Sequence, residues 1–195
     1  MIVRDILVEY ISRILRSDKA LAPFAILNLE DSFSFQLPVV SGEANINITT
    51  GGQVDRIDNL RGVTRIVDYK TGAVADSIAL IDDLFTEDRK KEADAWLQTL
   101  LYCEAWLVNN PGTIVMPSVY KIKKMGRVSI DNSLKLKTDR TAEVSVTDYS
   151  AVRTEFMDGL AGVVNTIFSS QEPFTMTSDA WGKCGYCPYK GLCLR

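Results

Sequence analysis

The chain has 195 residues, 46% apolar and 24% charged, which is enough for one globular domain with a hydrophobic core. It contains no histidine, which excludes Ser-His-Asp and Cys-His catalytic sites and any zinc site built on histidine. The net charge of −3 argues against a free-standing nucleic-acid binder, and no apolar run approaches the roughly 20 residues of a membrane span.

The spacing of apolar residues predicts the secondary structure in chain order. Residues 2–17 carry apolar side chains at i, i+4 spacing, which indicates a helix. Alternating apolar and polar residues then predict three strands, at 24–37, 44–58 and 64–71. Residues 73–91 lack a regular period and mix both charges, so we expect a surface loop there.

The second half continues with a helix over 92–108, which the sequence Asn-Asn-Pro-Gly ends. Two more strands are predicted at 113–124 and 127–137, and a last helix at 148–169 with Thr147 as its N-cap. The order of helix, three strands, helix, two strands and helix predicts an α/β sandwich around a mixed sheet.

Three of the four cysteines lie in the last 15 residues, 181–195, which we call the cysteine-rich tail and expect to have little regular structure. Because no signal peptide is visible, Cys184, Cys187 and Cys193 indicate metal ligation in a reducing, cytoplasmic compartment more than disulfides. The chain shows neither repeats nor an internal linker, so we expect residues 1–195 to form a single domain.

The sequence Ile-Val-Asp-Tyr-Lys-Thr-Gly at 66–72 places Asp68 and Lys70 on one face of a strand, because strand side chains alternate. The strands on either side of residues 60–63 are predicted to form an antiparallel hairpin. One register is favoured because it sets Asp58 opposite Arg65, as an opposite-charge pair, and Ile57 opposite Ile66. That register continues with Asp55 opposite Asp68, Val54 opposite Tyr69 and Gln53 opposite Lys70.

Two facing carboxylates repel each other at a Cα separation of roughly 4.5–5.5 Å. They coexist if one is protonated, if Lys70 lies between them, or if they share a divalent cation. Two carboxylates, a backbone carbonyl and water make a normal Mg²⁺ site, in which Lys70 can hold or help deprotonate a water. The alternative is a half-exposed hairpin on which Asp55, Asp68 and Lys70 form a solvated ion network.

Three motifs resemble the PD-(D/E)XK nuclease superfamily, specifically the RecB/AddB-like exonuclease domains attached to helicases. They are G-Q-V-D-R-I-D at 52–58, R-I-V-D-Y-K-T-G at 65–72 and Q-T-L-L-Y at 98–102. The resemblance implies a restriction-endonuclease-like core, with a mixed central β-sheet flanked by helices. It also implies that Asp55, Asp68 and the backbone carbonyl of Tyr69 bind Mg²⁺ or Mn²⁺, and that Lys70 assists the attacking water.

The family's Q-x-x-x-Y motif is matched by Gln98 and Tyr102, whose i, i+4 spacing puts both on one helical face. Glu30 matches a glutamate common on the family's first strand, and we expect it to support the site without binding the metal. Family members also begin with a helix that bears an acidic or histidine ligand, which this sequence does not match. We expect a C-terminal fragment of a longer protein, or a natural variant without that ligand, and an isolated chain that cleaves slowly or not at all.

The tail spacing C-x₂-C-x₅-C resembles the last three cluster ligands of AddB-type iron–sulfur nucleases, whose first cysteine lies far upstream. A [4Fe–4S] cluster needs four thiolates as a rule, and Cys103 is the one other thiol in this chain. The resemblance therefore implies a cluster in the full-length protein. The alternative for this chain is a tail without a ligand, or one that takes up zinc adventitiously.

We interpret the sequence as a metal-dependent DNA exonuclease, a hydrolase of DNA repair and recombination that works with a helicase domain or subunit and not at a membrane. The helicase would supply most phosphate contacts. One alternative is a DNA-binding scaffold of the same fold with impaired catalysis, and another is a small metalloprotein that uses the tail alone. Local cations that could contact phosphates are Arg56, Arg89, Lys90, Lys91, Lys121, Lys123 and Lys124.

Overall fold

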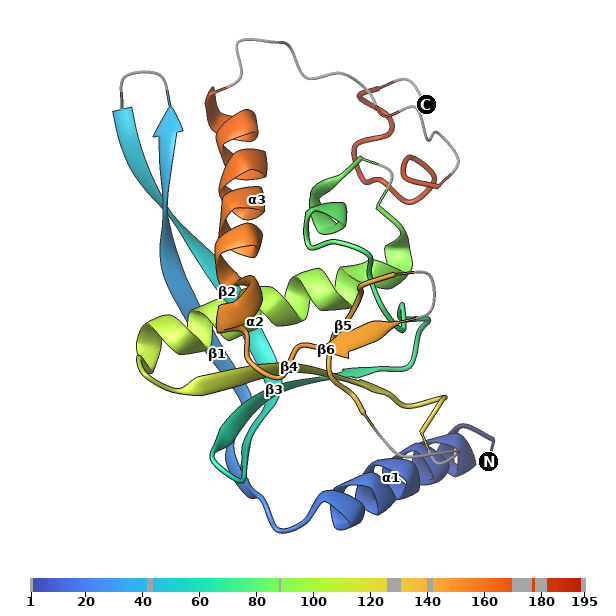
Figure 1. Ribbon diagram of the computed structural model, residues 1–195. Helices are drawn as coiled ribbons and strands as arrows, with labels where there is room; N and C mark the ends of the chain where they lie inside the picture. Colours follow the sequence, from blue (N-terminus) through green and yellow to red (C-terminus); the bar gives the residue numbers. More distant parts are fainter. Residues whose placement is uncertain are drawn as a thin grey trace.

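The computed structural model describes residues 2–41, 44–87, 89–125, 131–139, 142–169, 177 and 182–193 of the chain. Helices and strands follow one another in the predicted order as far as β4 (Figure 1). The elements are α1 (Ile2–Leu21), β1 (Ala25–Ser41), β2 (Ala44–Leu60), β3 (Val63–Lys70), the 3-10 helices η1 (Asp82–Phe85) and η2 (Lys91–Ala93), α2 (Asp94–Asn109), β4 (Ile114–Lys121), β5 (Lys135–Lys137), β6 (Glu143–Ser145) and α3 (Ser150–Ser169).

The central sheet has the strand order β1-β2-β3-β4. The first three strands pair antiparallel, and α2 then carries the chain back so that β4 runs parallel to β3. α2 and α3 lie over one face of the sheet and α1 lies against the other (Figure 1). The predicted α/β fold, with a mixed central sheet flanked by helices, is confirmed.

Two apolar clusters lie on opposite faces of this sheet, because side chains alternate along β3. Ile66 is fully buried and belongs to the larger cluster, together with Trp96 of α2. Its neighbour Val67 faces the other way, into a smaller cluster with Tyr120, against which Ile14 of α1 packs. The direction of each β3 side chain therefore decides whether it meets α2 or α1.

The segment between β3 and α2 differs from the surface loop that its composition predicts. Val74, Ile78, Ile81 and Leu84 are all buried in the larger cluster. Ile81 and Leu84 belong to the short 3-10 turn of η1, whereas Ile78 forms an isolated β-bridge with Leu136. The charged residues among the four apolar ones hide this pattern in the sequence. The indole N–H of Trp96 also donates to the backbone of this segment, at the carbonyl of Ala75, over 2.9 Å.

Two predicted elements near the end of the chain also differ. Of the described residues 131–137 within the predicted strand 127–137, Lys135–Lys137 form a strand, β5, which pairs with β6 in a separate two-stranded sheet. Residues 126–130 lie outside the described residues. α3 begins at Ser150, and Asp148 takes the capping role predicted for Thr147, because its Oδ1 accepts the N–H of Ser150 at 2.9 Å.

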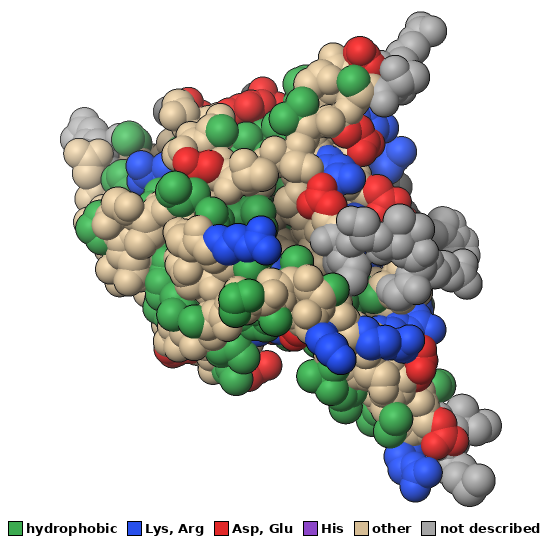
Figure 2. Space-filling view, turned by 60° about the horizontal axis from the view of Figure 1, so that its bottom comes forward, with side chains coloured by type: hydrophobic (Ala, Val, Ile, Leu, Met, Phe, Trp, Pro, Cys, Tyr) green, Lys and Arg blue, Asp and Glu red, His purple; other side chains and the backbone are tan. Residues whose placement is uncertain are grey.

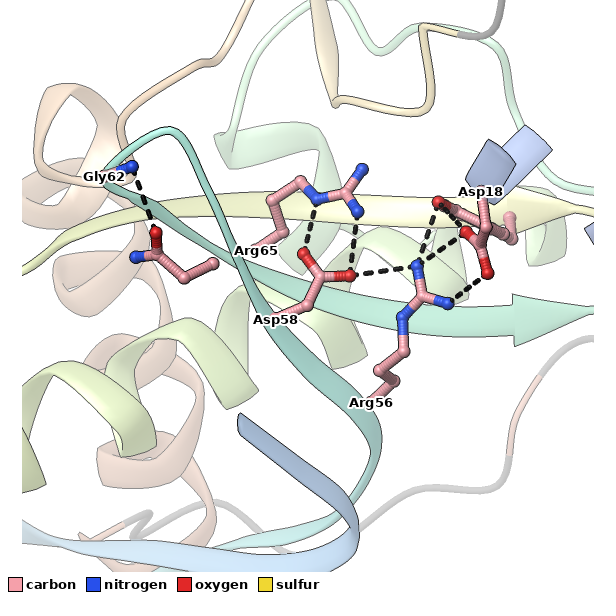
Figure 3. Close-up of polar contacts among 7 residues, drawn as sticks. Asp18, Arg56, Asp58, Gly62 and Arg65 are labelled. Atoms are coloured by element: carbon pink, nitrogen blue, oxygen red, sulfur yellow. Dashed lines mark hydrogen bonds and ion pairs between the residues drawn. The ribbon is translucent and has the colours of Figure 1, made fainter. Parts of the chain in front are cut away.

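The hairpin of β2 and β3 turns at two left-handed residues, as tight hairpins require. The φ angles of Arg61 and Gly62 are 55° and 90°. Asn59 Oδ1 accepts the N–H of Gly62 at 3.0 Å and closes the turn (Figure 3). The first part of the predicted register is confirmed, with the pairs Asn59–Thr64, Asp58–Arg65, Ile57–Ile66 and Arg56–Val67.

A buried ion network lies on the α1 face of this hairpin (Figure 3). Arg65 donates to both carboxylate oxygens of Asp58, at 2.6 and 2.8 Å. Arg56 lies between Asp58, at 2.9 Å, and Asp18 of α1, at 2.7 Å. The side chains of Arg56, Asp58 and Arg65 are each 3% exposed or less. Arg56 is therefore not available to contact a phosphate, although the sequence analysis named it among the cations that could do so.

We predict that Asp58→Ala lowers the free energy of unfolding by about 3–5 kcal/mol, because Arg56 and Arg65 lose a buried counter-charge. Urea denaturation measures the loss. Asp5→Ala is the matched control, since Asp5 forms an exposed ion pair with Arg4 at 3.5 Å and its removal should change stability by less than about 0.5 kcal/mol. Small and equal losses in both variants would contradict a stabilising role for the network.

Candidate active site

β3 ends in two charged side chains on the face that α2 covers, as predicted from strand alternation. Asp68 is only 1% exposed, and its Oδ1 accepts a hydrogen bond from Lys70 Nζ at 3.1 Å. Its Oδ2 lies 2.9 Å from the same ammonium, but outside hydrogen-bond geometry. Among the described residues, this buried oxygen has no hydrogen-bond partner. Asp68 therefore retains an oxygen that can accept a further ligand.

Asp55 lies where the pairing of the sheet is interrupted. The ladder between β2 and β3 ends at Arg56 and Val67, so the predicted continuation with Asp55 paired to Asp68 is not formed. The side chain of Asp55 instead accepts the backbone N–H of Tyr69 through Oδ2, at 2.8 Å. The ladder between β2 and β1 likewise contains no pair at Asp55. A carboxylate thus replaces a backbone acceptor at the point where both neighbouring strands leave β2 unpaired.

The two acids influence each other electrostatically. Burial is the largest effect on Asp68 and raises its pKa, while the hydrogen bond and charge of Lys70 lower it. The negative charge of Asp55 raises the pKa of Asp68 further, so the net shift is upward. One ammonium therefore does not fully compensate the buried charge. A cation placed between the two carboxylates would relieve both the burial penalty and the repulsion.

The oxygens at this position fit a divalent cation, which prefers carboxylate and carbonyl ligands. Lys70 turns its carbonyl toward β4, where Ile122 donates to it at 3.0 Å. Backbone groups alternate along a strand, so Tyr69 turns its own carbonyl toward β2 and Asp55. Within the described part of the chain, no three acidic or thiol side chains converge, so Asp55, Asp68 and this carbonyl would need water to complete a coordination shell.

α2 brings Gln98 and Tyr102 to the same place. Lys70 Nζ donates to Gln98 Oε1 at 2.8 Å, and Gln98 Nε2 donates to Tyr102 Oη at 2.7 Å. Asp68, Lys70, Gln98 and Tyr102 therefore form one hydrogen-bonded chain from β3 to α2. The orientation of the Gln98 amide is fixed, because its oxygen faces the ammonium. The hydroxyl proton of Tyr102 remains able to donate elsewhere.

Gly52 belongs to the G-x-x-D motif, but sequence reasoning assigned it no role. A Cβ atom built on Gly52 would lie 2.9 Å from Cε1 and 3.1 Å from Oη of Tyr102. β2 therefore approaches the tyrosine ring so closely that a side chain at this position would displace it. A glycine inside a strand often marks such a close approach, and this was the signal in the sequence.

Glu30 lies on β1 at the level of Asp55, since the pairs on either side of it place the two residues opposite each other. Its φ of 50° is left-handed, and its carbonyl accepts Gln53 Nε2 at 2.9 Å. The side chain itself is exposed. Support of the site by Glu30 stays a prediction.

The cysteines fall into two groups. Cys103 is fully buried in the larger apolar cluster, and burial raises the pKa of its thiol well above the usual value, which argues against it as a fourth cluster ligand. Cys184, Cys187 and Cys193 lie in turns of the tail, and described residues 182–193 contain no helix or strand, as predicted. Among the described residues, the three tail thiols do not form a metal-binding group.

A family model described as the PD-(D/E)XK nuclease superfamily matches residues 1–194 of the chain. No curated protein and no solved structure matches the chain. In the part of the chain that the structure describes, every helix is too short or too polar to cross a membrane.

We predict that Gly52→Ala lowers the free energy of unfolding by about 1–3 kcal/mol, because the added methyl group overlaps the Tyr102 ring. Denaturant unfolding tests this, with Gly72→Ala as control, since a Cβ there meets no atom within 4 Å. In a Tyr102→Ala background the same glycine substitution should cost much less, and the difference measures the coupling. An unchanged cost in that background would show that the ring is not the cause.

Proposed function

The chain belongs to the PD-(D/E)XK nuclease superfamily, and on this premise we propose that it is a metal-dependent deoxyribonuclease. Members of the superfamily are nucleases that typically use divalent ions such as Mg²⁺ or Mn²⁺. The mixed four-stranded sheet between helices agrees with its restriction-endonuclease-like fold. The proposed reaction is hydrolysis of phosphodiester bonds in DNA.

The observation that carries the proposal is the buried carboxylate of Asp68. Its Oδ2 has no hydrogen-bond partner among the described residues, although a buried polar atom is normally paired. Asp55 adds a second carboxylate close enough to shift the pKa of Asp68. A plain ion pair between Asp68 and Lys70 would need no second acid, whereas a metal site built on carboxylates uses both Asp55 and Asp68.

Asp55, Asp68 and the Tyr69 carbonyl would hold the ion, which supplies a Lewis acid that stabilises charge developing on the phosphate oxygens. Lys70 has three N–H donors, of which one is directed to Asp68 and one to Gln98. The third can donate to a water molecule or to a phosphate oxygen. Lys70 is thus held in place to orient the attacking water and to bind the negative charge of the transition state.

The two residues on α2 position Lys70 and do not need to react. Gln98 accepts from the ammonium and donates to Tyr102, so the two residues add a second anchor that holds Nζ beside Asp68. The Tyr102 hydroxyl can in turn donate to a phosphate oxygen beside the site. This assignment gives the Q-x-x-x-Y motif a mechanical role, namely to hold the lysine.

We further propose that the enzyme is a RecB/AddB-like exonuclease that works with a helicase in bacterial DNA repair and recombination in the cytoplasm. The three motifs from Gly52 to Tyr102 and the spacing of the tail cysteines support this narrower assignment. If the full-length protein adds a fourth thiolate, Cys184, Cys187 and Cys193 would bind a [4Fe–4S] cluster.

One observation favours the second candidate, a scaffold of the same fold with impaired catalysis. Asp18 of α1, an acid of the first helix, binds Arg56 on the face of the sheet opposite α2. It therefore does not serve as an additional ligand beside Asp55 and Asp68. A site with two carboxylates would hold a metal more weakly than one with three.

We predict that Lys70→Met in the full-length protein lowers the rate of DNA cleavage at least about 10²-fold, because a donor to the transition state is lost. Cleavage of linear duplex and single-stranded DNA is measured with Mg²⁺ and with Mn²⁺. The matched control is Lys124→Met, since Lys124 pairs with Asp76 at 2.7 Å on the surface, and it should keep the normal rate.

Calorimetry beside the cleavage assay distinguishes residues that bind the metal from residues that act in the cleavage step. Asp68→Asn should abolish both cleavage and calorimetric binding of Mn²⁺ in the absence of DNA, while Lys70→Met should retain Mn²⁺ binding. A full-length protein that binds DNA but shows no cleavage sensitive to these substitutions would support the scaffold. Unaltered Mn²⁺ binding by Asp68→Asn would contradict the metal site.

A further inference from the structure

A hollow of about 420 Å³ opens beside Gln98 and Tyr102, the two residues of α2 that position Lys70. Its walls come from α2, from α3, from the end of η1 and from β2 at Thr50 and Gly51. α3, orange in Figure 1, runs alongside β1 and meets α2 at this position. Because Gln98 and Tyr102 also belong to the hydrogen-bonded chain from Asp68, the hollow adjoins the candidate active site.

Most of the side chains that line this hollow are apolar. They come from three elements and are Phe85 of η1, Leu97 and Leu101 of α2, and Leu160 and Val163 of α3. Val163 is 39% exposed, and the other four are partly buried against the core. A concave, mostly apolar surface with a few polar groups at its edge is typical of a ligand site.

The charges of the hollow compensate each other. Its lining contains one basic and one acidic side chain, Arg89 and Asp94, which pair at 2.8 Å. Arg89 is held further by the carbonyl of Leu84, to which it donates at 2.7 Å. The hollow therefore has no surplus charge that would attract a phosphate. It suits an uncharged group that is largely apolar.

The aromatic side of the hollow is fixed in place by α3. The ring centroids of Phe85 and Phe156 lie 5.5 Å apart, and a Cβ atom built on Gly159 would overlap the Phe85 ring. The ring thus lies directly against the backbone of α3. A wall that is already in position loses little conformational entropy when a ligand binds.

The end of the hollow next to the candidate site is polar. The amide nitrogen of Gln98 has two N–H donors, of which one is directed to Tyr102. The other can donate to a carbonyl oxygen or a ring nitrogen. A ligand with flat apolar faces and a polar edge would match both parts of the hollow, and among the components of DNA this describes the nucleobase.

α1 presents another exposed apolar surface, but it lies away from the candidate site. Leu7, Ile11 and Leu15 are each more than half exposed. Figure 2, in which the face with α1 is turned forward, shows hydrophobic side chains on that face. α1 packs on the face of the sheet opposite α2, so the sheet separates this surface from Asp68 and Lys70.

We propose that the hollow binds one unpaired nucleobase of the DNA beside the phosphodiester bond that is cut, an inference that rests on the proposed nuclease function. Aromatic and apolar side chains bind bases of any sequence, because every base has a π-face. In a duplex each base is paired and stacked, so a base enters the hollow only from a single strand or from an opened end. Its nucleotide would then extend past Gln98 toward Lys70.

The test compares two single strands that carry the same phosphate charges. One is a fluorescein-labelled oligothymidylate, and the other is an abasic strand of equal length. Both are titrated against the full-length protein in EDTA, so that binding is measured without cleavage. Stacking of one base on an aromatic side chain changes affinity by roughly 5- to 150-fold. The protein should therefore bind the thymidine strand at least about 5-fold more tightly than the abasic strand.

Two substitutions alter the hollow from different elements. Val163→Trp should lower this preference at least about 5-fold, because the indole fills the hollow, while the affinity for the abasic strand should not change. Phe85→Leu keeps an apolar side chain but removes the ring, and should lower the preference as well. Val108→Trp is the matched control, since Val108 is 50% exposed on α2 and does not line the hollow.

Circular dichroism checks that each variant is folded, and either Val163→Trp or Phe85→Leu decides the outcome if the other does not fold. A folded variant that keeps the full preference would overturn the inference and leave the hollow to a protein partner. Equal binding of both strands by the unmodified protein would overturn it too. Failure of the proposed function is a separate result, namely cleavage that Asp68→Asn and Lys70→Met do not change.

Discussion

The buried pairing of Asp58 with Arg65 is the contact on which the geometry of the site depends. It joins two neighbouring strands in a place where water cannot compensate a mismatch, so any other register would bury an unpaired charge. A slip by one residue would also turn every side chain of β3 to the opposite face. Asp68 and Lys70 would then meet α1, which contributes Asp18 and apolar side chains, and not the Gln98 of α2.

The site itself occupies a defect in the sheet. β2 pairs with β1 along most of its length and with β3 over Arg56–Leu60, but it pairs with neither strand at Asp55. The hydrogen bond from Tyr69 to the Asp55 carboxylate satisfies one backbone group that the interrupted ladder leaves free. The sheet thus loses regular pairing where two like charges approach, and the ordered network of Arg56, Asp58 and Arg65 immediately beyond it keeps the strands aligned.

Much of this arrangement could be predicted from the sequence because it depends on local rules. Strand alternation set the directions of Asp68 and Lys70, opposite charges set the hairpin register, and i, i+4 spacing joined Gln98 to Tyr102. The missing pair at Asp55 could not be predicted. The pairing rules assume that each backbone N–H of a strand donates to a backbone carbonyl, whereas the N–H of Tyr69 donates to the Asp55 side chain. The burial of Ile78 and Leu84 was equally hidden, because a single β-bridge to Leu136 and one short 3-10 turn have no period long enough to recognise. The contact of Gly52 with Tyr102 joins elements far apart in the chain.

The anchoring of residues 74–84 has a consequence for how substrate reaches the site. Val74, Ile78, Ile81 and Leu84 are each buried in the core, and full burial of one such side chain stabilises by roughly 1.5–3 kcal/mol. Lifting this segment would expose all four at once, so open conformations are rare at equilibrium. The segment therefore behaves as a rigid wall and not as a gate. A ligand that reaches the candidate site along this wall would not have to wait for the segment to move.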